Sequence, residues 1–254
     1  MMPVGHRSRT FAVRTLLAVG ALTGLAGPAS AETTAAFYLG SSHTANSDVQ
    51  IRQPSTGSDA TFHDISWNSE SFTNPIYWGI RVNHFFDEQP HWGVGFDYTH
   101  DKVIADTNQV VRVDGTWNGA PVNESAPMNQ RVQSFSISHG VNIFALNGYY
   151  RWRRESNNSL LCARCQVYVG AGPTYYVLHA ENTVNGAHNG EGYKGAGFGY
   201  QLLGGLQYAV TPTVGVFIES KYNSGNIEVD TAGGGRAETT LNSSQLLAGM
   251  SVGF

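Results

Sequence analysis

Two short blocks of the sequence, YTHDKV and SHGVN, contain the side chains best suited to chemistry. They contribute five polar candidates: His100, Asp101, Lys102, His139 and Asn142. An imidazole can take up or release a proton near neutral pH and can also bind a metal ion. We therefore take His100 as a candidate base or metal ligand and the other four as supporting groups.

His100 falls on an apolar face if its segment is extended. Trp92, Val94, Phe96 and Tyr98 precede it at every second residue, and side chains two apart share one face of a strand. A polar group is costly on a face that is otherwise apolar. His100 is therefore informative, although histidine is also tolerated where an apolar surface meets water.

The side of the strand on which His139 lies is left open by the sequence. Phe144, Leu146 and Tyr150 share one face of the strand, and if that face points outward, His139 points inward. Phe135 and Ile137 suggest the opposite assignment. A β-bulge near Gly140 would reconcile the two patterns.

A second set of charged residues lies on the other face of several segments. Its members are Arg81, Asp97, Arg151, Glu219 and Lys221. A lone buried charge is costly, so we expect these residues to pair inside the molecule. A network that fills the interior is favoured over a catalytic role, because a narrow barrel leaves little room for a substrate.

The elements that must position these residues are eight segments with the period-two alternation of a β-strand. They lie at about 34–45, 76–86, 92–102, 134–152, 166–179, 199–210, 214–223 and 241–254. Alternation of apolar with small or polar residues is typical of a strand that faces lipid on one side and a packed interior on the other.

The connections between these segments alternate between short and long. DEQPH and TPT are tight turns, whereas 46–75, 103–133, 180–198 and 224–239 are long polar loops. Short turns and long loops are typical of barrels with periplasmic turns and external loops. The sequence therefore predicts an all-β fold, a single eight-stranded antiparallel transmembrane β-barrel of the outer membrane.

In this arrangement four histidines lie near the outer rim: His43, His100, His139 and His179. Rims and loops are polar in any case, so a structural role remains the alternative to chemistry at each of them.

Both ends of the chain predict export. Residues 1–31 have a basic start, a short apolar run and a small-residue cleavage site, which is typical of a signal peptide. The last segment ends at Phe254 behind four apolar residues in register, and this resembles the C-terminal signature read by the barrel-assembly machinery. We expect residues 32–254 to form one barrel domain, with outer-membrane lipid or lipopolysaccharide and that machinery as partners.

The charge of the chain argues against nucleic acid as a partner. Of 15 basic residues three are leader arginines, which leaves 12 against 19 acidic residues and a net charge of −7. These charges are scattered and form no basic patch. The sequence also contains no G-x-S-x-G, H-E-x-x-H, Walker or dinucleotide-binding fingerprint.

The two cysteines, Cys162 and Cys165, lie in the sequence CARC. In an exported protein such a pair is predicted to form a disulfide. Free thiols and a two-ligand metal site are the alternatives, and the second is weak because zinc usually takes four ligands.

Several blocks resemble the lipid A oxidase-like outer-membrane barrels of alphaproteobacteria, within a wider set of OmpA-like small barrels. They are NPIYWGIRVNHFFDE, HWGVGFDYTHDKVIAD, SISHGVNIFALNGYYRW and VYVGAGPTYY, and the resemblance covers about residues 75–254. It implies oxidation of the proximal glucosamine of lipid A to an aminogluconate unit, with dioxygen as co-substrate. It places the candidate groups in YTHDKV and SHGVN and leaves the identity of any metal or other cofactor unknown.

Three functions are therefore open. The first is an enzyme that acts on lipid A through His100 and its neighbours. The second is a non-enzymatic OmpA-like barrel that supports the membrane and presents its loops at the surface. The third is an OmpW-like conduit for small molecules, which needs an open interior path.

Overall fold

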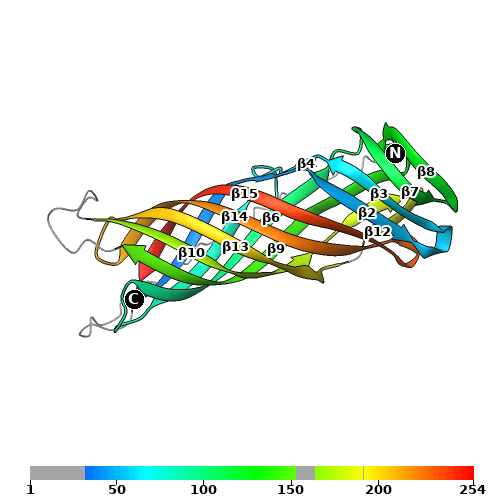
Figure 1. The fold of residues 1–254 in the computed structure, drawn as a ribbon. Helices are drawn as coiled ribbons and strands as arrows, with labels where there is room; N and C mark the ends of the chain where they lie inside the picture. Colours follow the sequence, from blue (N-terminus) through cyan, green and yellow to red (C-terminus); the bar gives the residue numbers. More distant parts are fainter. Residues whose placement is uncertain (1–31, 153–163, 191) are drawn as a thin grey trace, which may run out of the picture.

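The computed structural model describes residues 32–152, 164–190 and 192–254 and shows an elongated all-β molecule (Figure 1). The predicted signal peptide, residues 1–31, lies outside the described residues. All strand pairs are antiparallel and belong to one sheet. Within the described part of the chain, no helix has the length and apolar character needed to cross a bilayer.

Eight long strands correspond to the eight segments that the alternation predicts, although several boundaries differ by one or more residues. They are β1 (Glu32–Thr44), β5 (Trp78–Phe85), β6 (Trp92–Ala105), β9 (Val132–Trp152), β10 (Cys165–Leu178), β13 (Lys194–Ala209), β14 (Val214–Thr231) and β15 (Gly235–Gly253). They pair in the order β1-β5-β6-β9-β10-β13-β14-β15, and β15 pairs in turn with β1. Each of these strands therefore has a hydrogen-bonded neighbour on both sides.

Burial along these strands is the reverse of that in a water-soluble protein. In β6, Val94 and Phe96 are exposed whereas Asp97 is fully buried. The exposed apolar side chains continue around the other strands as a belt, with members Phe37, Leu39, Ile80, Val82, Leu146, Val169, Leu202, Ile218, Leu246 and Met250. Charged and polar groups fill the space enclosed by the strands.

The long connections are not irregular loops, and this prediction was wrong. They form seven further strands: β2 (Ser47–Gln53), β3 (Ser58–Ile65), β4 (Trp67–Asn68), β7 (Val110–Trp117), β8 (Ala120–Pro127), β11 (Glu181–Val184) and β12 (Ala187–Gly190). The sheet therefore has fifteen strands rather than eight. Short 3-10 turns, η1 (Pro54–Thr56), η2 (Met128–Gln130) and η3 (Ala232–Gly234), join some of them.

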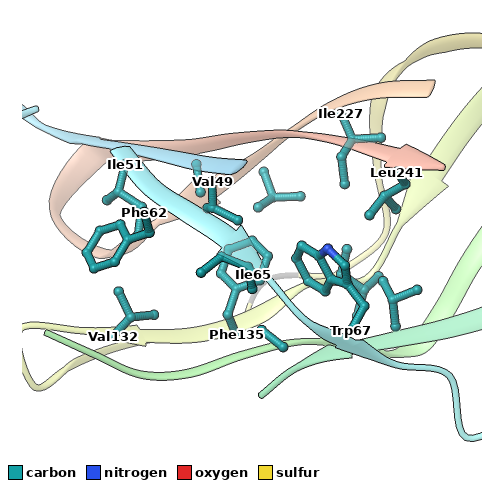
Figure 2. Packing of buried hydrophobic residues seen from close by; sticks show 14 of the residues in the cluster. Val49, Ile51, Phe62, Ile65, Trp67, Val132, Phe135, Ile227 and Leu241 are labelled. Carbon is teal, nitrogen blue, oxygen red and sulfur yellow. The ribbon is translucent and has the colours of Figure 1, made fainter. Parts of the chain in front are cut away.

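These strands, together with the adjoining ends of β9, β14 and β15, form a second region that we call the extension (Figure 1). It has an apolar core of its own, in which Phe62 meets the ring of Trp117 edge to face at 5.5 Å. Val49, Ile51, Ile65, Trp67, Val132 and Phe135 are also buried in this core (Figure 2). Fully burying such side chains stabilises a fold by about 1.5–3 kcal/mol each.

β9 contains the irregularity that the conflicting parity suggested. Asp101 of β6 is paired with Val141, but Val103 is paired with Ile137, so β9 has two extra residues at this point. Gly140 lies within the irregularity and has φ +145°, a conformation that favours glycine. Phe135 and Ile137 are buried in the extension core, so the assignment that turned them outward was wrong.

Candidate site at the outer ends of β6 and β9

An open groove of about 560 Å³ lies on the outer surface where β5, β6, β9 and β10 run side by side. It brings together three of the five predicted candidates: His100, His139 and Asn142. Its other lining residues are mainly apolar or aromatic: Pro75, Trp78, Tyr98, Phe144, Val177 and Tyr193. The groove therefore combines an apolar surface with a few polar groups, as ligand sites commonly do.

The polar floor of the groove is a hydrogen-bonded group of three side chains. His100 and Asn142 are directly opposite in the β6–β9 pair, and His100 Nδ1 lies 2.9 Å from Asn142 Oδ1. The Tyr98 hydroxyl donates to the same oxygen at 2.7 Å. An amide oxygen can only accept, so the Nδ1 atom of His100 must carry the hydrogen in this arrangement.

The tautomer leaves the other ring nitrogen of His100 available. In the neutral ring, a protonated Nδ1 means that Nε2 has a free lone pair. Nε2 is buried and has no hydrogen-bond partner among the described residues. A buried polar atom without a partner is rare enough to suggest a role in binding or catalysis.

Packing holds the imidazole of His100 in one orientation. The ring is stacked against Trp78, with centroids 6.0 Å apart, and only 7% of His100 is exposed. A Cβ at position 140 would lie 2.8 Å from His100 Cε1, which is too close for any residue larger than glycine. The bulge at Gly140 thus makes room for the imidazole.

His139 lies on the rim of the groove rather than on its floor. The irregularity of β9 exposes it, and its ring packs against that of His179 in a tilted arrangement with centroids 5.0 Å apart. Tyr193 packs on His179 in turn and donates a hydrogen bond to the His139 carbonyl at 2.6 Å. The His139 Nδ1 atom lies 3.6 Å from the carboxylate of Glu181.

Asp101 and Lys102 do not line the groove. The Asp101 carboxylate accepts hydrogen bonds from the Lys102 backbone at 2.8 Å and from Gln245 at 3.3 Å, within the interior. The Lys102 ammonium donates to the carbonyl of Thr73 at 2.8 Å and lies 3.5 Å from the Glu70 carboxylate. The structure therefore places neither residue in contact with His100 through its side chain.

Four of the five predicted interior charges form one network. The Arg81 guanidinium bridges Asp97 at 2.7 Å and Glu219 at 2.6 Å. Lys221 binds Asp97 at 3.1 Å, and Tyr168 donates to Glu219 at 2.8 Å. All four charged residues of the network are at least 98% buried.

Arg151, the fifth predicted interior charge, lies apart from this network. Its guanidinium contacts the Glu32 carboxylate at 2.7 Å and donates to the Pro90 carbonyl at 2.7 Å. It also stacks over the ring of Phe85 at 3.6 Å. Glu32 begins β1 and Pro90 lies in a short turn, so Arg151 closes the end of the molecule opposite to the groove.

Several groove residues were not recognised from the sequence as part of a site. Tyr98 shares the outward face of β6 with His100, and this signal was present in the YTHDKV block. Tyr193 lies in a connection remote from both blocks and gives no sequence signal. Among the residues that the structure describes, no group of three or more His, Cys, Asp or Glu is placed to hold a metal ion.

Cys162 lies outside the described residues, so the disulfide between Cys162 and Cys165 stays a prediction. Cys165 is the first residue of β10.

Of the comparisons with known proteins, only the one with solved structures finds similar proteins. No family model matches the chain. No curated protein matches it either.

Among solved structures, the chain is similar to three bacterial proteins. The Neisserial surface protein NspA is 16% identical, and the match covers 88% of this chain and 97% of NspA with a TM-score of 0.42. The outer membrane protein OprG from Pseudomonas aeruginosa is 12% identical, with 88% of this chain and 96% of OprG covered and a TM-score of 0.46. The outer membrane protein AlkL is 13% identical, with 91% of this chain and 93% of AlkL covered and a TM-score of 0.46. At these TM-scores the likeness supports no inference about the function of this chain.

Proposed function

We propose that this chain is a β-barrel protein of the outer membrane, in which the eight long strands form the wall of the barrel. The support is its own burial pattern, in which an apolar belt faces outward and the Arg81 network lies inside. A continuous belt of this kind is favourable next to lipid, because exposing so much apolar surface to water costs free energy. Phe254, exposed just after β15, suits recognition by the assembly machinery during insertion.

We further propose that the groove acts on lipid A. The observation that supports this is the unpartnered Nε2 of His100, buried in a lipid-facing groove at one end of the apolar belt. This end carries the extension, and the longer loops of outer-membrane barrels face the outside of the cell. The groove would then lie level with the sugar head groups of the outer leaflet.

In this proposal His100 is the base and Asn142 is a positioning residue. Oxidation of the proximal glucosamine at its hemiacetal carbon removes the hydroxyl proton, which Nε2 can accept, and the hydrogen on that carbon with its electron pair, which dioxygen takes up to form hydrogen peroxide. Water then opens the resulting lactone to the aminogluconate unit. Asn142 holds the ring by accepting the Nδ1 hydrogen. Dioxygen is the oxidant that the sequence resemblance implies.

Mass spectrometry of lipid A tests this proposal. A strain that lacks the gene is complemented with the native chain, His100→Ala, Asn142→Leu or Asn142→Asp. We expect His100→Ala to lower the oxidised fraction at least about 100-fold, the usual size of a general-base contribution. Asn142→Leu should also lower it, whereas Asn142→Asp should retain activity because a carboxylate accepts the same hydrogen bonds.

His43→Ala is the matched control, because His43 is an exposed histidine near the outer end of β1 that does not line the groove. It should leave the oxidised fraction unchanged, and exclusion of dioxygen should abolish the product. Identical lipid A masses in the deletion strain and its parent would count against the proposal.

The extension favours the second function, a non-enzymatic surface barrel, as the alternative. Its apolar core makes it a built structure rather than a set of mobile loops, and such a surface suits contact with other molecules. Under this alternative, every histidine variant keeps the native phenotype, whereas deletion of the β7–β8 hairpin changes it.

The third function, a conduit, is opposed by the filled interior. The internal cavity between Arg81, Tyr149 and Arg151 measures about 20 Å³, which is close to the space one water molecule needs. Small solutes such as alkanes or sugars therefore do not fit there.

A further inference from the structure

The wall of the molecule beside the groove is incomplete, and residues 70–77 cover the gap. β5 begins at Trp78, and its pairing with β1 on one side and with β6 on the other ends there. β1 and β6 continue beyond this point, to Thr44 and Ala105. We call residues 70–77 the strap. In this stretch β1 and β6 are bridged by the strap and by the two residues of β4, which pair with β6.

The strap is held to the rest of the molecule at a few points. The Ser42 backbone donates to the Ser71 hydroxyl at 2.9 Å, and the Tyr77 hydroxyl donates to Gln245 at 3.0 Å. The Thr73 carbonyl accepts from the Lys102 ammonium of β6 at 2.8 Å, and the Tyr77 backbone donates to the Ser71 carbonyl within the strap at 2.8 Å. Between the buried residues Ser71 and Tyr77, residues 72–76 are exposed, and an exposed stretch of this kind belongs to the low-stability end of a fold.

Lys102 lies beneath the strap. It is two residues beyond His100 on β6, so both side chains leave the strand on the same outward face. Only 3% of the Lys102 side chain is exposed. Its ammonium is balanced by one carbonyl, that of Thr73, and by the Glu70 carboxylate, which is itself 47% exposed and 3.5 Å away.

The strap is also one wall of the groove. Pro75 lines the groove next to Trp78 and His100, while the Phe72 side chain is 82% exposed and points away from the protein. Movement of the strap would therefore widen the groove and uncover a cation that lies two residues from His100 on the same face of β6. An apolar residue such as Phe72 could be accommodated by lipid in the displaced position.

We propose that Lys102 and His100 form a covered subsite for the anionic group, a phosphate or a carboxylate, on the sugar head group of an outer-leaflet lipid. The strap closes this subsite in the free protein, and Glu70 occupies the place of the ligand's anion. On binding, a phosphate replaces a single distant carboxylate with several acceptor oxygens and forms charge-assisted hydrogen bonds. This inference rests on the proposed function, because it names the substrate class of the same groove.

Lipid binding to the purified full chain in detergent micelles tests the subsite. The probes are lipid A with a phosphate on its distal sugar and a free anomeric hydroxyl on its proximal sugar, and the same lipid A after removal of that phosphate. We expect Lys102→Met to weaken binding of the phosphorylated form about tenfold or more, as loss of a charge-assisted hydrogen bond does. We expect Glu70→Gln to strengthen binding of that form several-fold, because it removes the competing carboxylate. Neither variant should change binding of the dephosphorylated form.

Lys194→Met is the matched control, because Lys194 is an exposed lysine paired with Asp230 and lies outside the groove. It should leave binding of both lipids unchanged. Slower gel mobility after boiling shows that each variant is folded before it is tested.

Three outcomes would overturn the subsite. Equal effects of Lys102→Met on both lipids would make Lys102 only an anchor of the strap. Weaker binding by Glu70→Gln would show that Glu70 supports the bound state instead of competing with it. Displacement of the phosphorylated lipid by millimolar inorganic phosphate would assign the site to free phosphate. If instead the native chain binds neither lipid, the proposed function itself fails.

Discussion

Arg81 is the residue on which the interior network depends, because among the described residues it alone joins the two buried carboxylates Asp97 and Glu219. Its loss leaves Glu219 buried with Tyr168 and with no other cation of the described chain in an ion pair with it. Breaking a buried pair from one side costs about 3–5 kcal/mol. We expect Arg81→Ala to lower the free energy of unfolding by this amount, measured by urea titration in lipid vesicles.

The control is Arg236→Ala. Arg236 pairs with Glu228 at 3.1 Å, but both side chains are exposed. Exposed pairs contribute about 0–1 kcal/mol, so this variant should unfold like the native chain. Similar losses for the two variants would contradict the account of the interior.

Residue positions that depend on strand parity could be predicted from the sequence. The inward set, with Arg81, Asp97, Glu219 and Lys221, is a property of period-two alternation, and so is the outward position of His100. The partner of His100 depends on register between strands, and the cover over Lys102 depends on Thr73, 29 residues away in the chain. Alternation within one strand predicts neither the register with the next strand nor which distant segment covers it.

At the scale of elements, the extension has a pH-sensitive contact. The His63 ring on β3 lies between the Asp48 carboxylate, 2.9 Å from Nδ1, and the Asp114 carboxylate, which hydrogen-bonds Nε2. The hydrogen bond to Asp114 raises the pKa of His63, and Asp48 adds to this, against a smaller opposite effect of burial. His63 therefore joins β2, β3 and β7 through its charged form.

This contact should stabilise the extension in acid more than in base. A raised pKa in the folded state means that the contribution is fully present below the unfolded pKa of about 6.5 and is lost as the pH rises through the folded value. We expect backbone amides of β3 to exchange with deuterium faster at about pH 8.5 than at about pH 5.5, after correction for intrinsic rates.

His63→Gln should remove this difference, because an amide does not titrate. A pH dependence that persists unchanged in His63→Gln would show that other groups are responsible.

The extension itself could not be recognised from the sequence as a set of strands. Val49, Ile51, Phe62 and Val113 do alternate with polar residues, but each run is short and lies among Gly, Asn, Asp and Ser. Short strands are stable here because they pack on each other and on the ends of β9, β14 and β15. That stabilisation comes from contacts between segments far apart in the chain, which local patterning does not report.

At the scale of the whole molecule, two regions with opposite burial share the same strands. β9, β14 and β15 pass from the belt, where apolar side chains face outward, into the extension, where they face a core. The groove with His100 lies where β6 and β9 pass from one region to the other. We expect the two regions to lose structure separately, since different interactions stabilise them.

Phe62→Ala tests this separation. Phe62 is fully buried in the extension core, and truncation of a buried Phe costs about 3–5 kcal/mol. We expect the variant to be cleaved by protease within β2, β3, β7 or β8 while the eight long strands keep the fast gel mobility that the proposed barrel has before boiling. Phe96→Ala, which truncates a Phe on the exposed belt, should leave protease resistance unchanged. If Phe62→Ala abolished the fast mobility as well, the extension core would be part of the folding unit of the barrel, and the groove would depend on both.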